Sequence, residues 1–275
     1  MARYLNQHWA PLAEVPVHKI GRADVAARLA DIAKGSGPFA ANRARAALSA
    51  LYGWAIGEGL VDQNPVVRTR KATEEISRDR ILSEEELRLT WQLAGDGEYG
   101  AIIRLLILTG QRREEVGGML WSEFRLQDGL WSIGAERTKN GKPHDVPLSS
   151  LALEILQGKS KREDRDLVFG AREGAFQGWS KAKGALDRRM LAALKNERGD
   201  RAKLKPWRLH DIRRTVATRL GDLGVLPHVV EAILNHISGH KAGVAGIYNR
   251  AIYAPEKRAA LQKWADHIAA LSGGR

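Results

Sequence analysis

The chain has 275 residues, of which 44% are hydrophobic and 28% charged, and this ordinary globular composition can supply a sizeable core. It contains no cysteine, so disulfides and thiolate zinc sites are excluded. It has no apolar run long enough to span a bilayer and no apolar signal region at its N-terminus, so we expect a cytoplasmic protein without membrane contact. The net charge of +12 fits either a solvated basic surface or a nucleic-acid partner, and charge alone does not choose between them.

Residues 1–72 are predicted to form a helical domain. Val25, Leu29 and Ile32 recur at the spacing of one helix face. A glycine and a proline at 37–38 then interrupt this helix.

A longer helix is predicted for residues 39–58. Its apolar stripe comprises Leu48, Leu51, Trp54 and Ala55. Arg43 and Arg45 lie on the same helix, where they form either an ordinary exposed face or a face that binds DNA phosphates. We predict DNA contact for both, although their positions alone do not decide between these interpretations.

A polar, charge-dense segment at 73–82 has the composition of an interdomain linker. The second domain, 83–275, opens with Ser83 and with Glu86 three residues later, which is the pattern of a capping box. Helices are expected near 84–94 and 98–108.

The pattern changes from helical to extended between Phe124 and Leu148. The segments FRLQ, LWSI and HDVPL are predicted as short strands, with turn signals at Asp128-Gly129 and Asn140-Gly141. Helical patterns then return and continue to the C-terminus. The predicted fold is therefore mainly α with a small antiparallel β-sheet (α+β).

Five short motifs in the second domain carry residues suited to phosphate chemistry. They are TGQRREEV from Thr109, RTKNGKPHDVPL from Arg137, LHDIRRT from Leu209, LNHISGH from Leu234 and GIYNR from Gly246. Their polar residues include Arg112, Lys139, His210, Arg213, His236 and Tyr248. Such a set can hold a phosphodiester between cations while a tyrosine oxygen attacks the phosphorus.

Two of these motifs leave more than one candidate. Arg112 and Glu115 can share a helix face, where the carboxylate would fix the plane of a guanidinium that binds two phosphate oxygens. Arg113 competes for the same role. Lys139 and Lys142 both lie at the predicted turn, and either can present a cation to DNA or act as a general acid.

The histidine motifs differ in how specific they are. His210 and Arg213 form H-x-x-R on a patterned helix, which places both side chains on one face beside Arg214. His236 and His240 are four apart, but the glutamate of the usual zinc motif is missing, so a metal site is a weak interpretation. We assign His236 as a hydrogen-bond donor to phosphate and leave His240 unassigned.

We expect no cofactor. The GKS sequence at Gly158 lacks the earlier glycine of a P-loop, so no nucleotide site is predicted. The sequence offers neither a carboxylate cluster for Mg²⁺ nor a third ligand beside the histidines, so no metal is predicted.

Together these motifs resemble the tyrosine recombinases, and most closely the integrases of phages and genomic islands. The resemblance covers essentially the whole chain and is strongest from about residue 109 to residue 251. Its motif register selects Arg112, Lys139 and Tyr248. The neighbouring alternatives that it rejects are Arg113, Lys142 and Tyr253.

The resemblance implies a helical core-binding domain and a catalytic domain that clamp duplex DNA. Tyr248 would attack the scissile phosphate to form a 3′-phosphotyrosyl link, while Lys139 protonates the departing 5′-hydroxyl. The residues expected to neutralise the non-bridging oxygens are Arg112, His210, Arg213 and His236. Lys142 and Arg214 are expected to bind DNA.

The implied partners are double-stranded DNA and three further copies of the chain, as a homo-tetramer on paired DNA sites, and this implies association with the nucleoid. Two alternatives remain: a type IB-like relaxing or resolving enzyme, and a decayed integrase that only binds DNA. Integrases of this group usually carry a further N-terminal arm-binding domain, and we expect the chain to begin too late to contain one.

The C-terminal segment 256–271 is predicted to be an amphipathic helix. Its apolar stripe comprises Leu261, Trp264, Ala265, Ile268 and Leu271. Such a helix ordinarily packs on its own domain, but in the resembled family it often docks into a neighbouring protomer. We expect docking of the second kind, with Trp264 as the anchor.

Overall fold

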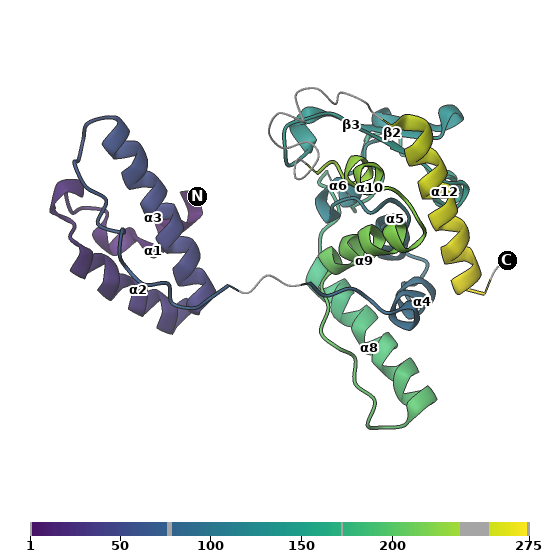
Figure 1. The fold of residues 1–275 in the computed structure, drawn as a ribbon, viewed down its shortest axis with the longest axis horizontal. Coiled ribbons are helices and arrows are strands. Elements are labelled where there is room, and N and C mark those ends of the chain that lie inside the picture. Colours follow the sequence, from purple (N-terminus) through teal and green to yellow (C-terminus); the bar gives the residue numbers. More distant parts are fainter. Residues whose placement is uncertain (1, 76–78, 172, 237–252, 274–275) are drawn as a thin grey trace. The chain divides into compact units, whose positions relative to one another are not determined.

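The computed structural model of the chain describes residues 2–75, 79–171, 173–236 and 253–273. The chain divides into two compact units, Met1–Arg78 and Asp79–Arg275, each with its own hydrophobic core (Figure 1). The division falls within the segment predicted as a linker, 73–82. In the described ranges, no helix is both long enough and apolar enough to cross a membrane.

The first unit is built from helices. They are α1 (Ala2–His8), η1 (Ala10–Leu12), η2 (Val17–Lys19), α2 (Arg22–Ser36) and α3 (Pro38–Gly57), of which η1 and η2 are 3-10 helices. The α2 helix buries Val25, Leu29 and Ile32, as their spacing predicts. The chain passes from α2 to α3 at Gly37, which has a φ of 90°. Glycine adopts this backbone conformation without strain, whereas other residues do not.

The buried face of α3 differs from the prediction at Trp54, which is 57% exposed. The buried residues of this helix are Ala41, Asn42, Ala44, Ala47, Leu48, Tyr52 and Ala55. Each residue of an α-helix turns by about 100°, so Trp54 lies roughly 240° around the axis from Leu48, whereas Ala55 returns almost to the same side. The predicted stripe was therefore wrong for Trp54.

Both ends of the predicted linker are attached to the unit beside them. The buried side chain of Asn42 donates to the carbonyl of Thr73 (2.8 Å) and accepts from the backbone of Ala72 (2.9 Å). At the other end, Leu82 is fully buried and its backbone N–H donates to the hydroxyl of Thr215 (2.8 Å). The segment that belongs to neither core is therefore shorter than 73–82.

The second unit surrounds a buried central helix, α5. Among its described residues, the α-helices are α4 (Glu84–Gln92), α5 (Glu98–Thr109), α6 (Arg113–Gly117), α7 (Ser150–Gln157), α8 (Trp179–Arg198), α9 (Leu209–Asp222), α10 (Pro227–Ile233) and α12 (Ala254–Leu271). Three 3-10 helices, η3 (Trp121–Glu123), η4 (Leu126–Asp128) and η5 (Ala135–Arg137), lie between α6 and α7. Every α5 residue except Glu98 and Arg104 is buried, and α4, α7, α9 and α12 pack around it. The predicted capping box is confirmed at the start of α4, where Ser83 Oγ accepts from the backbone of Glu86 (3.2 Å) and Glu86 Oε2 accepts from the backbone of Ser83 (2.9 Å).

A three-stranded antiparallel sheet covers part of this core and confirms the predicted fold class. Its strands are β1 (Phe124–Arg125), β2 (Leu130–Ile133) and β3 (His144–Pro147), in the order β1-β2-β3. Trp131 pairs with Val146 and Ile133 with His144, and all four side chains are buried. The connection between β2 and β3, residues 134–143, carries one predicted catalytic residue, Lys139.

The C-terminal helix α12 packs on its own unit, against α5, α10 and β3 (Figure 1). Trp264 is fully buried, and its indole donates to the carbonyl of Ile107 near the end of α5 (2.7 Å). The prediction that α12 docks into a neighbouring protomer through Trp264 is therefore wrong. The ordinary behaviour of an amphipathic helix prevails, because this stripe covers the core of its own domain.

Trp264→Phe should lower the free energy of unfolding by about 1–3 kcal/mol, because a buried carbonyl loses its donor and part of the ring volume is removed. Urea denaturation followed by circular dichroism measures the change. Trp54→Phe is the matched control, since that ring is exposed, and it should change stability by less than about 0.5 kcal/mol. Equal losses in the two variants would contradict the packing of α12 described above.

Candidate active site

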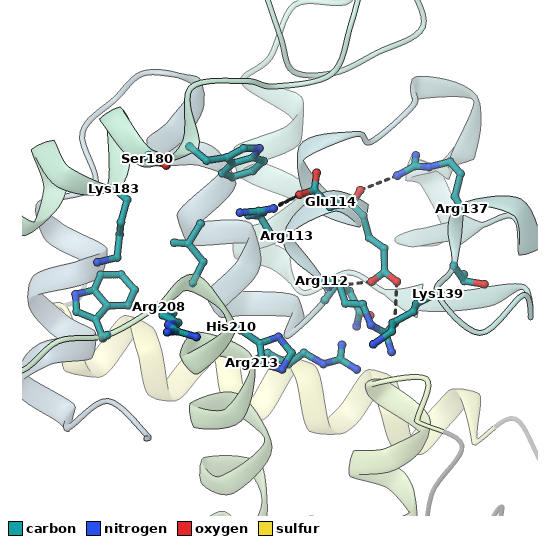
Figure 2. Close-up of a pocket in the computed structure, with 16 residues that line it drawn as sticks. Arg112, Arg113, Glu114, Arg137, Lys139, Ser180, Lys183, Arg208, His210 and Arg213 are labelled. Atoms are coloured by element: carbon teal, nitrogen blue, oxygen red, sulfur yellow. Dashed lines mark hydrogen bonds and ion pairs between the residues drawn. The ribbon is translucent and has the colours of Figure 1, made fainter. Parts of the chain in front are cut away.

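A pocket of about 740 Å³ in the second unit gathers most of the predicted catalytic residues. It is bounded by the start of α6, the β2–β3 connection, the start of α8 and the segment that leads into α9 (Figure 2). The predicted site residues that line it are Arg112, Glu115, Lys139, His210 and Arg213, whereas His236 is not among the lining residues. Tyr248 and His240 lie outside the described residues.

Arg112 is held in place by Glu115. Its Nη1 donates to Glu115 Oε1 (2.8 Å), and its backbone N–H donates to Glu115 Oε2 (2.8 Å). Glu115 is 3% exposed, so its carboxylate stands behind the guanidinium as the sequence predicts. The competing Arg113 also lines the pocket, but it pairs with Glu114, and its guanidinium lies 5.1 Å from the ring centroid of Trp179.

Arg213 lies deeper and is almost entirely buried. Its Nη1 donates to the carbonyl of Gly110 (2.9 Å), and its Nη2 donates to the carbonyl of Leu234. Burial, together with the nearby charge of Arg112, lowers the pKa of Arg213 to about 10. That value is still well above neutral pH, so the side chain keeps its charge and can face an anion in the pocket.

The two predicted histidines keep their rings accessible in a strongly positive field. The pKa of His210 is lowered mainly by partial burial, and further by the charges of Arg214 and Arg213. Partial burial is also the main cause that lowers the pKa of His236, and the charges of Arg213, Arg112 and Lys139 lower it further. Both imidazoles are therefore biased toward the neutral form, which donates through a single N–H.

The β2–β3 connection favours Lys139 over Lys142 as the residue that faces the pocket. Both lysines are exposed, but Lys139 lines the pocket and Lys142 is not among its lining residues. The hydroxyl of Thr138 lies within hydrogen-bond distance of the carbonyls of Ala135 (3.0 Å) and Lys142 (2.8 Å) and shares its one proton between them, which fixes the turn.

Three predicted DNA-binding arginines are not among the residues that line this pocket. Arg214 donates to the buried carboxylate of Asp211 (2.7 Å). In the first unit, exposed Arg43 pairs with Glu75 (2.6 Å). Arg45 donates to the hydroxyl (2.9 Å) and carbonyl (3.1 Å) of Thr69 and so holds the chain that follows α3.

Several pocket residues were not predicted from the sequence. Arg137 donates to both Glu123 carboxylate oxygens (2.8 Å each) and to the carbonyl of Glu115 (2.7 Å), so it supports the residue that holds Arg112. Its place at the head of the RTKNGK motif was a usable signal. Lys183 joins the pocket from α8, whose local sequence gave no such signal, and its ammonium lies 3.7 Å from the ring centroid of Trp207.

Comparison with known proteins adds evidence from outside this chain. Residues 82–253 match the phage integrase family. Prophage integrase IntZ of Escherichia coli strain K12 is 29% identical over 245 residues, which cover 86% of this chain and 57% of that protein. Prophage integrase IntA of the same strain is 29% identical over 227 residues, covering 80% of this chain and 52% of that protein. The chain thus spans little more than half the length of these relatives.

Solved structures show the same fold. A lambda integrase (75–356) dimer bound to a COC′ core site has a TM-score of 0.57 at 23% identity, covering 86% of each chain. The Tn1549 transposon integrase in complex with a circular intermediate DNA has a TM-score of 0.58 at 17% identity, covering 86% of this chain and 83% of that one. The family match extends over more than half of the chain and includes the helix that carries His210 and Arg213, so this chain belongs to the phage integrase family.

Proposed function

We propose that this chain is a site-specific DNA recombinase that cleaves and rejoins DNA strands through a 3′-phosphotyrosyl intermediate. The observation that carries the proposal is the convergence of Arg112 and Arg213 on one pocket, the first fixed by Glu115 and the second by backbone carbonyls. Two guanidinium groups held in this way can bind the non-bridging oxygens of a phosphodiester without rearranging during the reaction.

In the proposed reaction, the Tyr248 hydroxyl oxygen attacks the phosphorus and the bond from phosphorus to the 5′-oxygen breaks. Lys139 gives its proton to that departing oxygen. His210 and His236 donate hydrogen bonds to the phosphoryl oxygens, whose negative charge increases in the transition state.

A 5′-hydroxyl from a second duplex then attacks the phosphotyrosine, which restores a phosphodiester and releases Tyr248. Because the intermediate retains a phosphoester bond, the overall exchange needs no nucleotide hydrolysis.

The proposed substrate is duplex DNA, and the proposed working state is a homo-tetramer on paired sites. The net charge of +12 favours binding to a polyanion, and the related lambda integrase has been solved as a tetramer bound to a Holliday junction. Such a substrate would associate the protein with the nucleoid. Lys142 and Arg214 are proposed to contact the DNA beside the pocket.

Tyr248→Phe should bind target DNA nearly normally but form no covalent adduct, because it lacks the attacking oxygen. Denaturing electrophoresis with nicked DNA measures the adduct, and a gel shift measures binding. Tyr253→Phe is the matched control and should retain adduct formation. Adducts that persist in Tyr248→Phe and vanish in Tyr253→Phe would identify Tyr253 as the nucleophile. No adduct from the wild type would favour a decayed integrase, and adducts without strand exchange would favour a type IB-like enzyme.

Lys139→Ala should slow cleavage of ordinary DNA by about 10²–10⁴-fold, which is the usual contribution of a general acid. A substrate with sulfur at the 5′-bridging position should largely restore the rate, because a thiolate departs without a proton. Single-turnover cleavage of both substrates makes the comparison. Rescue in Lys142→Ala instead would assign the proton to Lys142.

Arg43→Ala should weaken DNA binding and reduce the slope of log affinity against log salt by about 1, as expected for one lost phosphate contact. Arg45→Ala should mainly lower thermal stability, because its guanidinium is hydrogen-bonded to Thr69. Salt titrations of DNA binding and thermal melts separate the two effects. An unchanged salt slope in Arg43→Ala would show that this residue does not contact phosphate.

A further inference from the structure

The end of α10 is held by side chains from several other elements. The carbonyl of Ile233 accepts hydrogen bonds from Gln111 Nε2 (2.8 Å) and His144 Nε2 (2.9 Å). The next carbonyl, of Leu234, accepts from Arg213. The last carbonyls of a helix have no partners within it, so these side chains satisfy groups that would otherwise be unpaired. They also fix the path of the chain just before His236.

The following residue, Asn235, forms a reciprocal pair with Asn140, 95 residues earlier in the chain. Asn140 Nδ2 donates to the carbonyl and to Oδ1 of Asn235 (3.0 Å each), and Asn235 Nδ2 faces Asn140 Oδ1 at 3.3 Å. The same Asn140 Oδ1 accepts from the backbone of Lys142 (3.2 Å), which closes the turn. Asn235 has φ 49°, a left-handed conformation that asparagine adopts more readily than most residues.

This pair joins two segments that each carry a proposed catalytic residue. Lys139 immediately precedes Asn140, and His236 immediately follows Asn235. Lys139 lies in a turn, and His236 follows α10, where its backbone N–H donates to the carbonyl of Glu231 (3.1 Å). These backbone bonds act within each segment, whereas the asparagine pair links one segment to the other. Lys139 is also close enough to His236 for its charge to lower the pKa of His236.

We propose that Asn140 and Asn235 are positioning residues that hold Lys139 in the pocket by joining its turn to the fixed end of α10. The proposal rests on the function proposed above. A general acid works only within hydrogen-bond reach of the leaving oxygen, and a displacement of about 1 Å can lower the rate on the order of 10²-fold. Asn140 acts on the reaction through its neighbours and needs no contact with the substrate.

The test compares leaving groups in single-turnover cleavage by the full chain. Asn140→Ala should slow cleavage of ordinary DNA by about 10- to 100-fold. The substrate with 5′-bridging sulfur should largely restore the rate, because misplacement of Lys139 matters only when the leaving group needs a proton. Asn235→Gly keeps the left-handed backbone accessible and leaves the Asn235 carbonyl for Asn140, so it should show the same rescue with a smaller loss.

The double variant should be no slower than Asn140→Ala, since both substitutions remove one shared interaction. Asn64→Ala is the matched control. In the first unit, Asn64 donates to the carbonyl and hydroxyl of Ser49 (3.1 and 3.2 Å) and accepts from the backbone of Val66 (3.0 Å). Its loss is a comparable structural defect and should affect both substrates equally.

Equal slowing of Asn140→Ala on both substrates, or no slowing on ordinary DNA, would overturn the proposal. Lys139→Ala separates this failure from failure of the proposed function. If sulfur rescues Lys139→Ala but not Asn140→Ala, the positioning role alone is refuted. If the wild type forms no adduct, or sulfur fails to rescue Lys139→Ala, the proposed chemistry is refuted and the positioning role with it.

Discussion

A buried guanidinium joins three parts of the second unit. Arg213, on α9, donates to the carbonyl of Gly110 after α5 and to the carbonyl of Leu234 after α10. Gly110 leads directly into the segment that holds Arg112, and Leu234 leads to His236. Burial of a charge is unfavourable unless strong hydrogen bonds offset it, so this arrangement restricts where those chain ends can lie. The geometry of the pocket follows from that restriction.

The cations in and beside this pocket repel one another, and this repulsion disfavours the folded arrangement of the pocket. Arg112 lowers the pKa of Arg213, and both arginines lower the pKa of His236. Glu115 and the carbonyl partners relieve only part of this repulsion. A phosphodiester between the cations would relieve more of it, so the electrostatic strain that disfavours the folded pocket favours anion binding. This links the stability of the second unit to its proposed substrate.

Much of the architecture could be predicted because its signals are local. The apolar period of α2 and the capping box of Ser83 and Glu86 depend on residues within a few positions of one another, and both are found as predicted. The three strands likewise follow from a local change of period. The Arg112–Glu115 hydrogen bonds also required only a spacing of three residues. Tyr248 remains a prediction that depends on its motif, since it lies outside the described residues.

The sequence by itself determined which segments form helices and strands and which motifs carry phosphate chemistry. The tertiary structure alone decided that Trp264 packs within its own domain, that Arg45 holds the chain after α3, and that Asn140 meets Asn235. The physical reason is that periodicity, caps and turns act between near neighbours in the chain. Hydrogen bonds and burial between residues far apart in the chain depend on how the elements pack. The spacing of neighbouring residues in the sequence does not show which distant groups will meet.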